Sequence, residues 1–455
     1  MKVVKFGGSS VASAAQLKKV ANIITSDEER RIVVVSAPGK RFAEDIKVTD
    51  LFINLFEALM DQNHVESSKE KIIDRFQLIV SDLNLPSLLL EDLSRRIDEV
   101  LYSNELLDVE KLDSLKAMGE DTLARVLSAY LETLGLKATY LNPMDAGIIV
   151  SNDPGKAQVL PESYDRLLTL RERDGITVIP GFFGYTTEGK LMTFPRGGSD
   201  ITGSIVAAGV QASLYENFTD VDSVFCVNPS IVEQPKEIKV LTYKEMRELS
   251  YAGFSVFHDE ALIPAFRAKI PVCIKNTNDP TKPGTMILSE RSSEEQIGPV
   301  VGIASARGFI SIYVGKYLMN REKGFGRRLL QILEEEGISF EHVPSGIDDL
   351  SVILREEQMT PEKERRVIDR IKTDLQADTV NVERNLAMIM IVGEGMDSAI
   401  GVAAKATEAF ARANVNIEMI NQGSSEVSMM FGVKEESIIP AVRSLYEQFF
   451  VKELV

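Results

Sequence analysis

The last third of the chain contains an internal repeat, and this repeat restricts the fold more than any other feature of the sequence. Residues 312–315 (Ile-Tyr-Val-Gly) resemble residues 390–393 (Met-Ile-Val-Gly), and residues 341–351 align without a gap with residues 418–428, at an offset of about 77 residues. Each copy reads as strand, helix, strand, strand and helix, with a possible closing strand at 379–382 in the first copy. That order predicts a small ferredoxin-like sheet with helices on one face, built twice. Chance similarity of two amphipathic stretches is the alternative, but the matched Gly, acidic and Ser positions favour duplication.

The first 290 residues have the pattern of an α/β domain. Residues 2–6 and 31–36 read as buried strands, and the amphipathic run at 12–24 between them predicts a helix. Strand, helix and strand is the unit of a parallel sheet. From about 51 to 134, Leu and Ile recur at helical spacing, which predicts a helical insert.

The expected domain boundaries follow from these patterns. Residues 278–298 contain Pro280, Pro283 and Gly284 and then a polar run, which indicates a linker. We therefore expect an α/β domain at 1–290, with helices on both faces of a mainly parallel sheet. Two ferredoxin-like domains are expected to follow it, at 300–383 and 384–455.

Composition excludes several classes of function. The net charge is −17, which argues against nucleic acid or a membrane surface as a partner. Only two cysteines (Cys226 and Cys273) and three scattered histidines occur, which argues against a disulfide framework or a Cys/His metal site and favours a reducing cytoplasm. Lys5 interrupts the apolar start expected of a signal peptide, and no apolar run approaches the ~18 residues of a membrane span. An anionic ligand must therefore be held by a local group of cations and backbone N–H groups.

Two Gly-Gly turns lie where a predicted strand meets a helix. They are Lys-Phe-Gly-Gly-Ser-Ser at 5–10 and Arg-Gly-Gly-Ser-Asp at 196–200. Adjacent glycines let backbone N–H groups approach an anion, and a helix N-terminus adds positive potential. The Walker A spacing is absent, and a tight turn or a helix cap formed by Ser199 or Asp200 is the plain alternative. Because both turns follow predicted parallel strands, they are expected at the sheet edge where ligands bind.

Other polar residues carry a weak signal when each is taken alone. Thr219 and Asp220 follow a predicted strand, and Lys275 ends another. Glu120 lies in a helical region, and Thr49 heads an amphipathic helix. A turn, a solvated surface residue and an N-cap are the ordinary interpretations of such positions.

Seven motifs in order, together with the repeat, resemble the aspartate kinase family along essentially the whole chain. The repeat is similar to the paired ACT regulatory domains of that family. The motifs are Lys-Phe-Gly-Gly-Ser-Ser at 5–10, Val-Ser-Ala-Pro-Gly-Lys at 35–40, Lys-Val-Thr-Asp at 47–50, Gly-Glu at 119–120, Arg-Gly-Gly-Ser-Asp at 196–200, Thr-Asp-Val-Asp at 219–222 and Lys-Asn-Thr at 275–277.

The resemblance implies an amino acid kinase fold, ATP with Mg²⁺, and transfer of the γ-phosphoryl group to the side-chain carboxylate of L-aspartate. The product would be 4-phospho-L-aspartate, an early intermediate of lysine, threonine and methionine synthesis. An ionised carboxylate needs no general base, so catalysis would consist of positioning and charge neutralisation. Glutamate 5-kinase, acetylglutamate kinase and uridylate kinase are rivals within the fold. A non-catalytic, kinase-like amino-acid sensor with an ACT pair is the alternative from another class.

The resemblance also assigns roles to residues. The transferring phosphoryl group and the nucleotide would contact Lys5, Gly7, Gly8, Ser9, Thr219, Asp220 and Lys275. Asp200 would orient Lys5. Aspartate would be bound by Arg196 at its α-carboxylate, by Glu120 at its ammonium, and by Thr49 and Ser199. No protein side chain is assigned to a metal, because Mg²⁺ would arrive with ATP.

In the first repeat, seven residues match positions at which the family binds a feedback amino acid, with lysine expected over threonine. Packing of the repeats is the alternative role for these positions. Effector sites of this kind imply a homodimer, or a dimer of dimers, that associates through the ACT domains. The residues are Met319, Gly324, Phe325, Gly326, Ser339, Phe340 and Glu341.

Four positions or segments depart from the family pattern: Ser9 stands where threonine is commoner, Phe194-Pro195 stands where Leu-Gly is usual, and two further segments each lose a cation. Asn228-Pro229-Ser230 replaces Asp-Pro-Arg, and His258-Asp259-Glu260 replaces His-Pro-Arg. Each exchange removes a cation near the expected nucleotide or domain interface, and this loss motivates the sensor alternative.

Overall fold

A computed structural model of the chain describes residues 1–254, 260–291, 298–423 and 427–451. The chain divides into two compact units, which are described separately. The N-terminal unit consists of residues 1–224, 237–247 and the described part of 255–296. The C-terminal unit consists of residues 225–236 and 248–254 and of the described residues from 298 onward.

The N-terminal unit is built on an eight-stranded sheet in the order β10-β12-β11-β7-β1-β2-β4-β3. Every neighbouring pair is parallel except β11 and β12, which are antiparallel. The central strands are buried on both faces, as expected of a sheet covered on both sides. The strands are β1 (Lys2–Phe6), β2 (Arg30–Val35), β3 (Ala138–Tyr140), β4 (Ile176–Pro180), β7 (Leu214–Thr219), β10 (Val240–Thr242), β11 (Val272–Asn276) and β12 (Thr285–Leu288).

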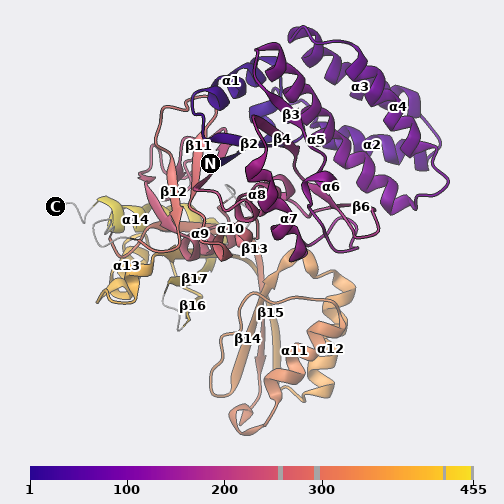
Figure 1. The fold of residues 1–455 in the computed structure, drawn as a ribbon. Helices are drawn as coiled ribbons and strands as arrows, with labels where there is room; N and C mark the ends of the chain where they lie inside the picture. Colours follow the sequence, from indigo (N-terminus) through magenta and orange to yellow (C-terminus); the bar gives the residue numbers. More distant parts are fainter. Residues whose placement is uncertain (255–259, 292–297, 424–426, 452–455) are drawn as a thin grey trace. The chain divides into compact units, whose positions relative to one another are not determined.

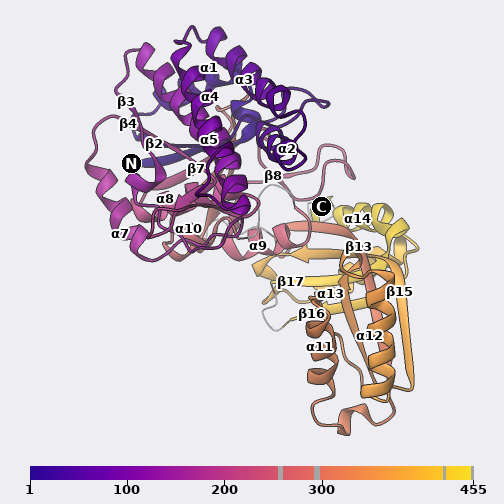
Figure 2. The same cartoon turned by 90° about the vertical axis from the view of Figure 1, so that its right-hand side faces the viewer.

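Helices cover both faces of this sheet (Figure 2). Val4, Phe6, Val33 and Val35 share one core cluster with the first five helices. The opposite face packs against α8, which in turn contacts α7 and α10. This arrangement confirms the expected α/β class. The helices are α1 (Ala14–Thr25), α2 (Val48–Met60), α3 (Val65–Asp82), α4 (Leu88–Leu101), α5 (Asp108–Thr133), α7 (Glu162–Leu168), α8 (Gly198–Gly209) and α10 (Ile263–Arg267).

The helical insert consists of α2, α3, α4 and α5, which lie together in Figure 1. Their apolar faces join the core cluster that covers the sheet. The insert therefore extends the hydrophobic core and does not form a separate body. The predicted linker at 278–298 contains β12, an added strand of the main sheet, so a linker can begin only after Leu288.

The C-terminal unit has a five-stranded antiparallel sheet in the order β14-β13-β15-β17-β16. Its four main helices form two pairs, and in both pairs the members begin 77 residues apart, which matches the repeat in the sequence. The strands are β13 (Gly302–Gly315), β14 (Asp349–Arg355), β15 (Thr379–Val392), β16 (Met419–Gln422) and β17 (Ser428–Lys434). The helices are α11 (Phe325–Glu335), α12 (Pro361–Asp374), α13 (Val402–Arg412) and α14 (Ile438–Tyr446).

Two long strands run through both copies of the repeat. Phe309–Gly315 of β13 pairs with Thr379–Leu386, whereas Gly302–Ala306 pairs with Met388–Val392 in the second copy. The second copy therefore takes one strand from a segment that precedes the first copy in sequence. The expected boundary between 383 and 384 falls within β15, because the two copies share one continuous sheet.

A buried ion pair crosses the sheet of the N-terminal unit. Arg30 Nε lies 2.6 Å from Glu216 Oε2, and Arg30 Nη2 donates to Glu216 Oε1 at 3.0 Å. Both side chains are buried. Removing one partner leaves a buried charge unpaired, which typically costs ~3–5 kcal/mol.

We predict that Arg30→Met lowers the stability of this unit by about 3–5 kcal/mol, because Glu216 is left buried and uncompensated. The urea midpoint of the unfolding transition and hydrogen exchange of β1 and β7 measure the effect. Lys137→Met is the control, since its pair with Asp174 is exposed to solvent and is expected to contribute little to stability. Equal effects of the two substitutions would contradict the prediction.

Candidate active site

Five parallel strands of the main sheet end at one edge, and the predicted site residues follow these ends. Backbone hydrogen bonds continue the sheet by one residue: Gly7 N–H donates to Phe218 at 3.0 Å, and Thr277 N–H donates to Thr219 at 2.9 Å. In open α/β sheets, ligands bind outside this carboxyl edge. The turns after β1, β2, β4, β7 and β11 therefore meet where the resemblance places ATP and aspartate.

Lys5 and Asp200 form an ion pair at this edge. Lys5 Nζ lies 2.6 Å from Asp200 Oδ1, and Lys5 is only 5% exposed. Asn217 is the neighbour of Lys5 in β7, and its Nδ2 donates to the same carboxylate oxygen at 2.6 Å. Two donors thus fix the Asp200 carboxylate, which in turn holds the buried ammonium in place.

Helix capping does not explain the second Gly-Gly turn. The N-cap of α8 is Gly197, with φ +82°, and no side chain caps the helix. Ser199 and Asp200 lie within the first turn, so the interpretation of either one as a cap is wrong. Thr49 is likewise the second residue of α2, whose N-cap is Lys47, and it is not a cap either.

The turn after β1 depends on close backbone contact between two glycines. Gly39 N–H donates to the Gly8 carbonyl oxygen at 2.8 Å. A Cβ on Gly39 would lie 2.6 Å from the Gly8 carbonyl carbon, so a larger residue does not fit without movement. The short 3₁₀-helix η1 (Gly8–Val11) starts here, and the first N–H groups of a helix have no partner within it. These groups and Lys5 together make a positively polarised cradle.

Glu120 supplies a buried carboxyl group beside this cradle. It lies on α5 and is 5% exposed, and its Oε2 is buried without a hydrogen-bond partner among the described residues. Burial raises the pKa of Glu120 to about 8, although the Ala37 backbone, Ser199 and Lys5 each favour the ionised form. An unpaired buried carboxyl group is costly unless a ligand completes it, and a cationic group is the natural complement.

Arg196 lies in the exposed turn between β6 (Leu191–Thr193) and α8, and its guanidinium has no ion-pair partner in the described part of the chain. The strand before this turn is anchored to α5, because buried Asp113 accepts from the N–H groups of Thr193 and Gly155, each at 2.8 Å. Arg196 thus follows an anchored strand and is not paired with any carboxylate among the described residues.

The predicted nucleotide residues lie farther along the same edge. Thr219 ends β7, its hydroxyl donates to the Asp220 carboxylate at 3.2 Å, and Asp220 is exposed. Lys275 in β11 is half-buried and has no ion-pair partner among the described residues. Asp222, between these strands, pairs with Lys282. Lys275 therefore remains available to an anion.

Sequence reasoning missed Asn217, Tyr215 and Gly181. The Tyr215 hydroxyl donates to the Asp200 carbonyl at 3.3 Å, and a Cβ on Gly181 would lie 2.8 Å from Ser199 Cβ. The available signal for Asn217 was a polar Asn next to Glu216 in a strand predicted to be buried. The other two roles depend on contacts distant in sequence.

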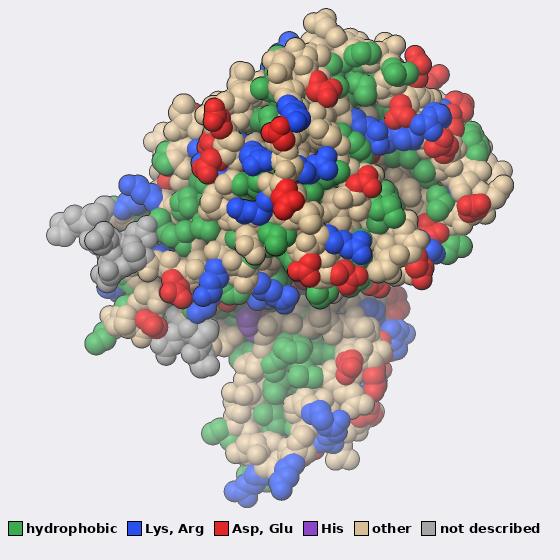
Figure 3. All heavy atoms as spheres, viewed as in Figure 1, with side chains coloured by type: hydrophobic (Ala, Val, Ile, Leu, Met, Phe, Trp, Pro, Cys, Tyr) green, Lys and Arg blue, Asp and Glu red, His purple; other side chains and the backbone are tan. Residues whose placement is uncertain are grey.

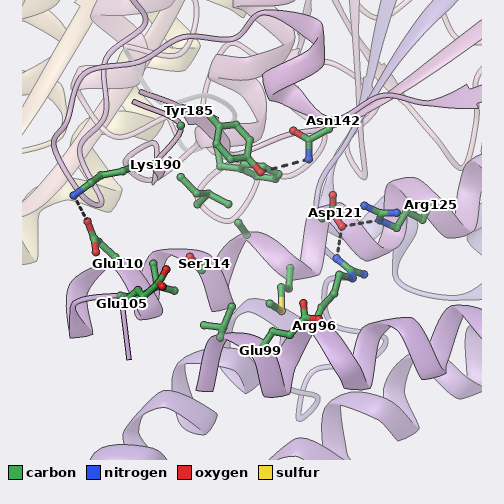
Figure 4. A pocket seen from close by; sticks show the side chains of 17 residues that line it. Arg96, Glu99, Glu105, Glu110, Ser114, Asp121, Arg125, Asn142, Tyr185 and Lys190 are labelled. Carbon is green, nitrogen blue, oxygen red and sulfur yellow. Dashed lines mark hydrogen bonds and ion pairs between the residues drawn. The ribbon is translucent and has the colours of Figure 1, made fainter. Parts of the chain in front are cut away.

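A cavity of about 500 Å³ lies between α4, α5 and the hairpin formed by β5 (Phe183–Tyr185) and β6 (Figure 4). None of the predicted site residues lines it. At one end, Asp121 accepts from Arg96, from Arg125 at 2.8 Å and from the Tyr140 hydroxyl. Since Asp121 follows Glu120 in α5, this network fixes the helix that carries the buried carboxyl group.

The predicted effector residues fall into two groups in the C-terminal unit. Met319 and Phe325 belong to the core of the first repeat, and Phe340 is 48% exposed. Ser339 N–H and Oγ both donate to Gln358 Oε1 at 2.9 Å. Gly324 and Gly326 flank the start of α11, whereas Ser339 follows its end.

Glu341 already has partners within the C-terminal unit. Its carboxylate lies 3.4 Å from Arg355 Nε and accepts a hydrogen bond from the Tyr251 hydroxyl. Any effector that binds at Glu341 must share or displace these contacts.

Of the two segments that lose a cation relative to the family pattern, Asn228-Pro229-Ser230 forms a turn in which Asn228 Oδ1 accepts from Ser230 N–H at 2.9 Å. His258 and Asp259 lie outside the described residues. Within the described ranges, no three His, Cys, Asp or Glu side chains gather as a metal site, and none of the helices has the length and apolar character to cross a membrane.

Comparison with protein families gives two matches. Residues 1–276 match the amino acid kinase family, and residues 389–449 match an ACT domain. Aspartokinase 3 from Bacillus subtilis is 59% identical over 455 residues, with all of both chains covered. Aspartokinase 1, chloroplastic, from Arabidopsis thaliana is 29% identical and covers 98% of this chain and 80% of its own.

Solved structures give the same result. The crystal structure of Clostridium acetobutylicum aspartate kinase has a TM-score of 0.87 and 38% identity, and covers 99% of this chain and 100% of its own. Escherichia coli aspartokinase III, in complex with aspartate and ADP, shares the fold, with a TM-score of 0.79, 24% identity, and coverage of 99% and 100%. The same enzyme in complex with lysine and aspartate gives a TM-score of 0.78, 24% identity, and coverage of 99% of each chain. The chain therefore belongs to the amino acid kinase family and, within it, to the aspartokinases.

Proposed function

We propose that the edge around Lys5, Gly8 and Asp200 transfers the γ-phosphoryl group of ATP to the side-chain carboxylate of L-aspartate, giving 4-phospho-L-aspartate. The observation that carries this assignment is the buried Lys5–Asp200 pair at 2.6 Å, set against the Gly8–Gly39 cradle. Aspartokinase activity itself is supported by 59% identity to a full-length relative. A non-catalytic sensor would have no need of a buried lysine held in place by Asp200 and Asn217.

The chemistry needs positioning and charge neutralisation. The aspartate side chain is ionised at neutral pH and attacks phosphorus directly, so no general base is required. Lys5 and the N–H groups of the Gly8 turn neutralise the charge of the transferring phosphoryl group. Asp200 holds the ammonium in place and aims it at that group.

Recognition of aspartate uses complementary charges. Glu120 receives the ammonium, since its buried oxygen has no partner among the described residues. Arg196 binds the α-carboxylate, a planar group that a guanidinium can grip with two hydrogen bonds. Thr49 and Ser199 add further hydrogen bonds to aspartate.

ATP is bound through Gly7, Ser9, Thr219, Asp220 and Lys275, and Mg²⁺ accompanies its phosphates. Mg²⁺ commonly keeps waters and phosphate oxygens as most of its ligands, so a dedicated protein cage is not required. Lys275, which has no ion-pair partner among the described residues, supports a phosphate contact at the end of β11.

We further propose feedback by lysine through the first repeat. Gly324 and Ser339 lie at opposite ends of α11, which has 11 residues and is therefore about 16 Å long. One copy of the repeat thus separates the two groups of effector residues, and a partner copy is needed to unite them around one small molecule.

A homodimer through the C-terminal units supports such a shared site. Hydrophobic side chains gather over β14 and β15 in Figure 3. A depression of about 730 Å³ lies on this sheet, lined among others by Tyr313, Ile353 and Met388.

The buried, free Cys226 and Cys273 support a reducing compartment, the cytoplasm.

Hydroxylamine traps acyl phosphates as coloured hydroxamates and tests the proposed reaction. We expect colour with Mg-ATP and L-aspartate and none with L-glutamate.

Lys5→Met should lower kcat at least ~100-fold, as loss of a transition-state donor does. Lys2→Met is the matched control, because Lys2 lies in the same strand but pairs with Asp27 at its other end. Absence of colour with the wild type would instead support the sensor.

Binding of aspartate is predicted to release a proton near pH 7. Burial raises the pKa of Glu120 to about 8, so the free enzyme holds a proton there that an incoming ammonium displaces. Affinity for aspartate should rise from about pH 6 to 8 and level off above, and Glu120→Gln should bind weakly with a flattened profile. Calorimetric titration with aspartate in buffers of different ionisation enthalpy measures how many protons are released on binding.

The raised pKa of Glu120 also predicts how the stability of the folded protein changes with pH. The folded state retains the proton that the unfolded chain loses near pH 4.5, so the free energy of unfolding should fall as pH rises from there to about 8. For Glu120→Gln, this contribution to the fall in the free energy of unfolding should be absent. An identical pH profile for the wild type and the variant would remove Glu120 from both roles.

Lysine should inhibit the enzyme, and Glu341→Gln should raise the half-inhibitory concentration about tenfold, the effect of ~1.4 kcal/mol. Inhibition is normalised to the uninhibited rate of each variant. Glu336→Gln is the control, since Glu336 pairs with Arg366 on the helical side of the same repeat. Unchanged sensitivity of Glu341→Gln would contradict its role as an effector residue.

A further inference from the structure

Arg75 buries its guanidinium against the loop that follows β2. It belongs to α3 of the helical insert and is 4% exposed. Its Nη2 donates to the Gly39 carbonyl at 2.7 Å and lies 3.5 Å from Asp45 Oδ2. Its Nε is buried without a hydrogen-bond partner among the described residues. A buried cation with an unpaired donor opposes folding, so this contact is kept at a cost in stability.

The peptide that Arg75 holds is the one that shapes the phosphoryl cradle. The N–H of Gly39 donates to the Gly8 carbonyl, and a Cβ on Gly39 would lie 2.6 Å from Gly8 C and 2.9 Å from Ser9 N. No free space separates the two backbones. A shift of Gly39 must therefore move Gly8 or break their hydrogen bond.

The rest of the loop is fastened at two further points. Arg41 Nε and Nη2 contact the Asp45 carboxylate at 2.7 and 2.9 Å, and these bonds hold the pKa of Asp45 well below its usual range. Val48 N–H donates to the Pro38 carbonyl at 3.1 Å. The loop is thus closed on itself, and Arg75 attaches it to the helical insert.

We propose that Arg75 is a positioning residue for phosphoryl transfer: by holding the Gly39 carbonyl, it fixes the Gly8 backbone beside Lys5. The inference rests on the proposed function of that cradle. Arg75 acts through Gly39 and touches neither substrate. A misplacement of ~1 Å can cost ~100-fold in rate. Loss of Arg75 should therefore lower kcat more than it weakens substrate binding.

The test compares Arg75→Met, Arg75→Lys and Arg75→Ala in the full chain by steady-state kinetics. Arg75→Met should lower kcat by about 30- to 100-fold, while the KM for aspartate stays within about threefold. Arg75→Lys keeps a charged donor and should recover much of the rate. Methylguanidinium at low concentration, matched against sodium chloride, should partly restore Arg75→Ala.

Arg30→Met is the matched control, because Arg30 is also a buried arginine but pairs with Glu216 away from the Gly39 loop. It should lower stability and leave kcat of the folded enzyme within about twofold. A kcat for Arg75→Met near the wild-type value overturns the proposal. The proposal is also overturned if the loss of activity matches the unfolded fraction of each variant, and if neither Arg75→Lys nor added methylguanidinium restores activity. An inactive wild type would mean that the proposed function itself has failed, and this inference with it.

Discussion

Lys5 carries a positive charge into the end of a central strand, where little water reaches it. A buried charge is expensive unless it is paired and hydrogen-bonded. Asp200, fixed by Asn217, provides that pairing from the first turn of α8. The glycine turns, the small residues around Ser199 and the placement of α8 are consistent with keeping these charges together at the carboxyl edge of the sheet.

The proposed site must bind two anionic reactants although the protein as a whole is negatively charged. The chain carries a net charge of −17, so its long-range field repels ATP and aspartate. Attraction must therefore be local, and the cations available near the carboxyl edge are Lys5 at the end of β1, Lys275 in β11 and Arg196 in the turn before α8. In the proposed site, Glu120 would add selectivity, because its buried Oε2 has no hydrogen-bond partner among the described residues and favours a ligand that brings an ammonium.

The C-terminal unit couples its two repeats through shared strands. β13 and β15 each pass through both copies, so a displacement of one copy is transmitted along continuous backbone. This construction suits a regulatory module, because a small molecule bound at one repeat acts on a single rigid sheet. Met319 and Phe325, two of the proposed effector residues, pack in the hydrophobic core of the first repeat.

The sequence by itself determined the fold class, the helical insert, the 77-residue repeat and the motifs around Lys5, Glu120, Arg196 and Asp200. These features depend on local periodicity and on residue types at fixed spacing, which a linear pattern records. Only the tertiary structure decided that Asn217 holds Asp200, that Gly39 presses on Gly8 and that residues 302–306 belong to the second repeat. Each of these facts is a contact between segments far apart in sequence, and local propensities do not encode the partner.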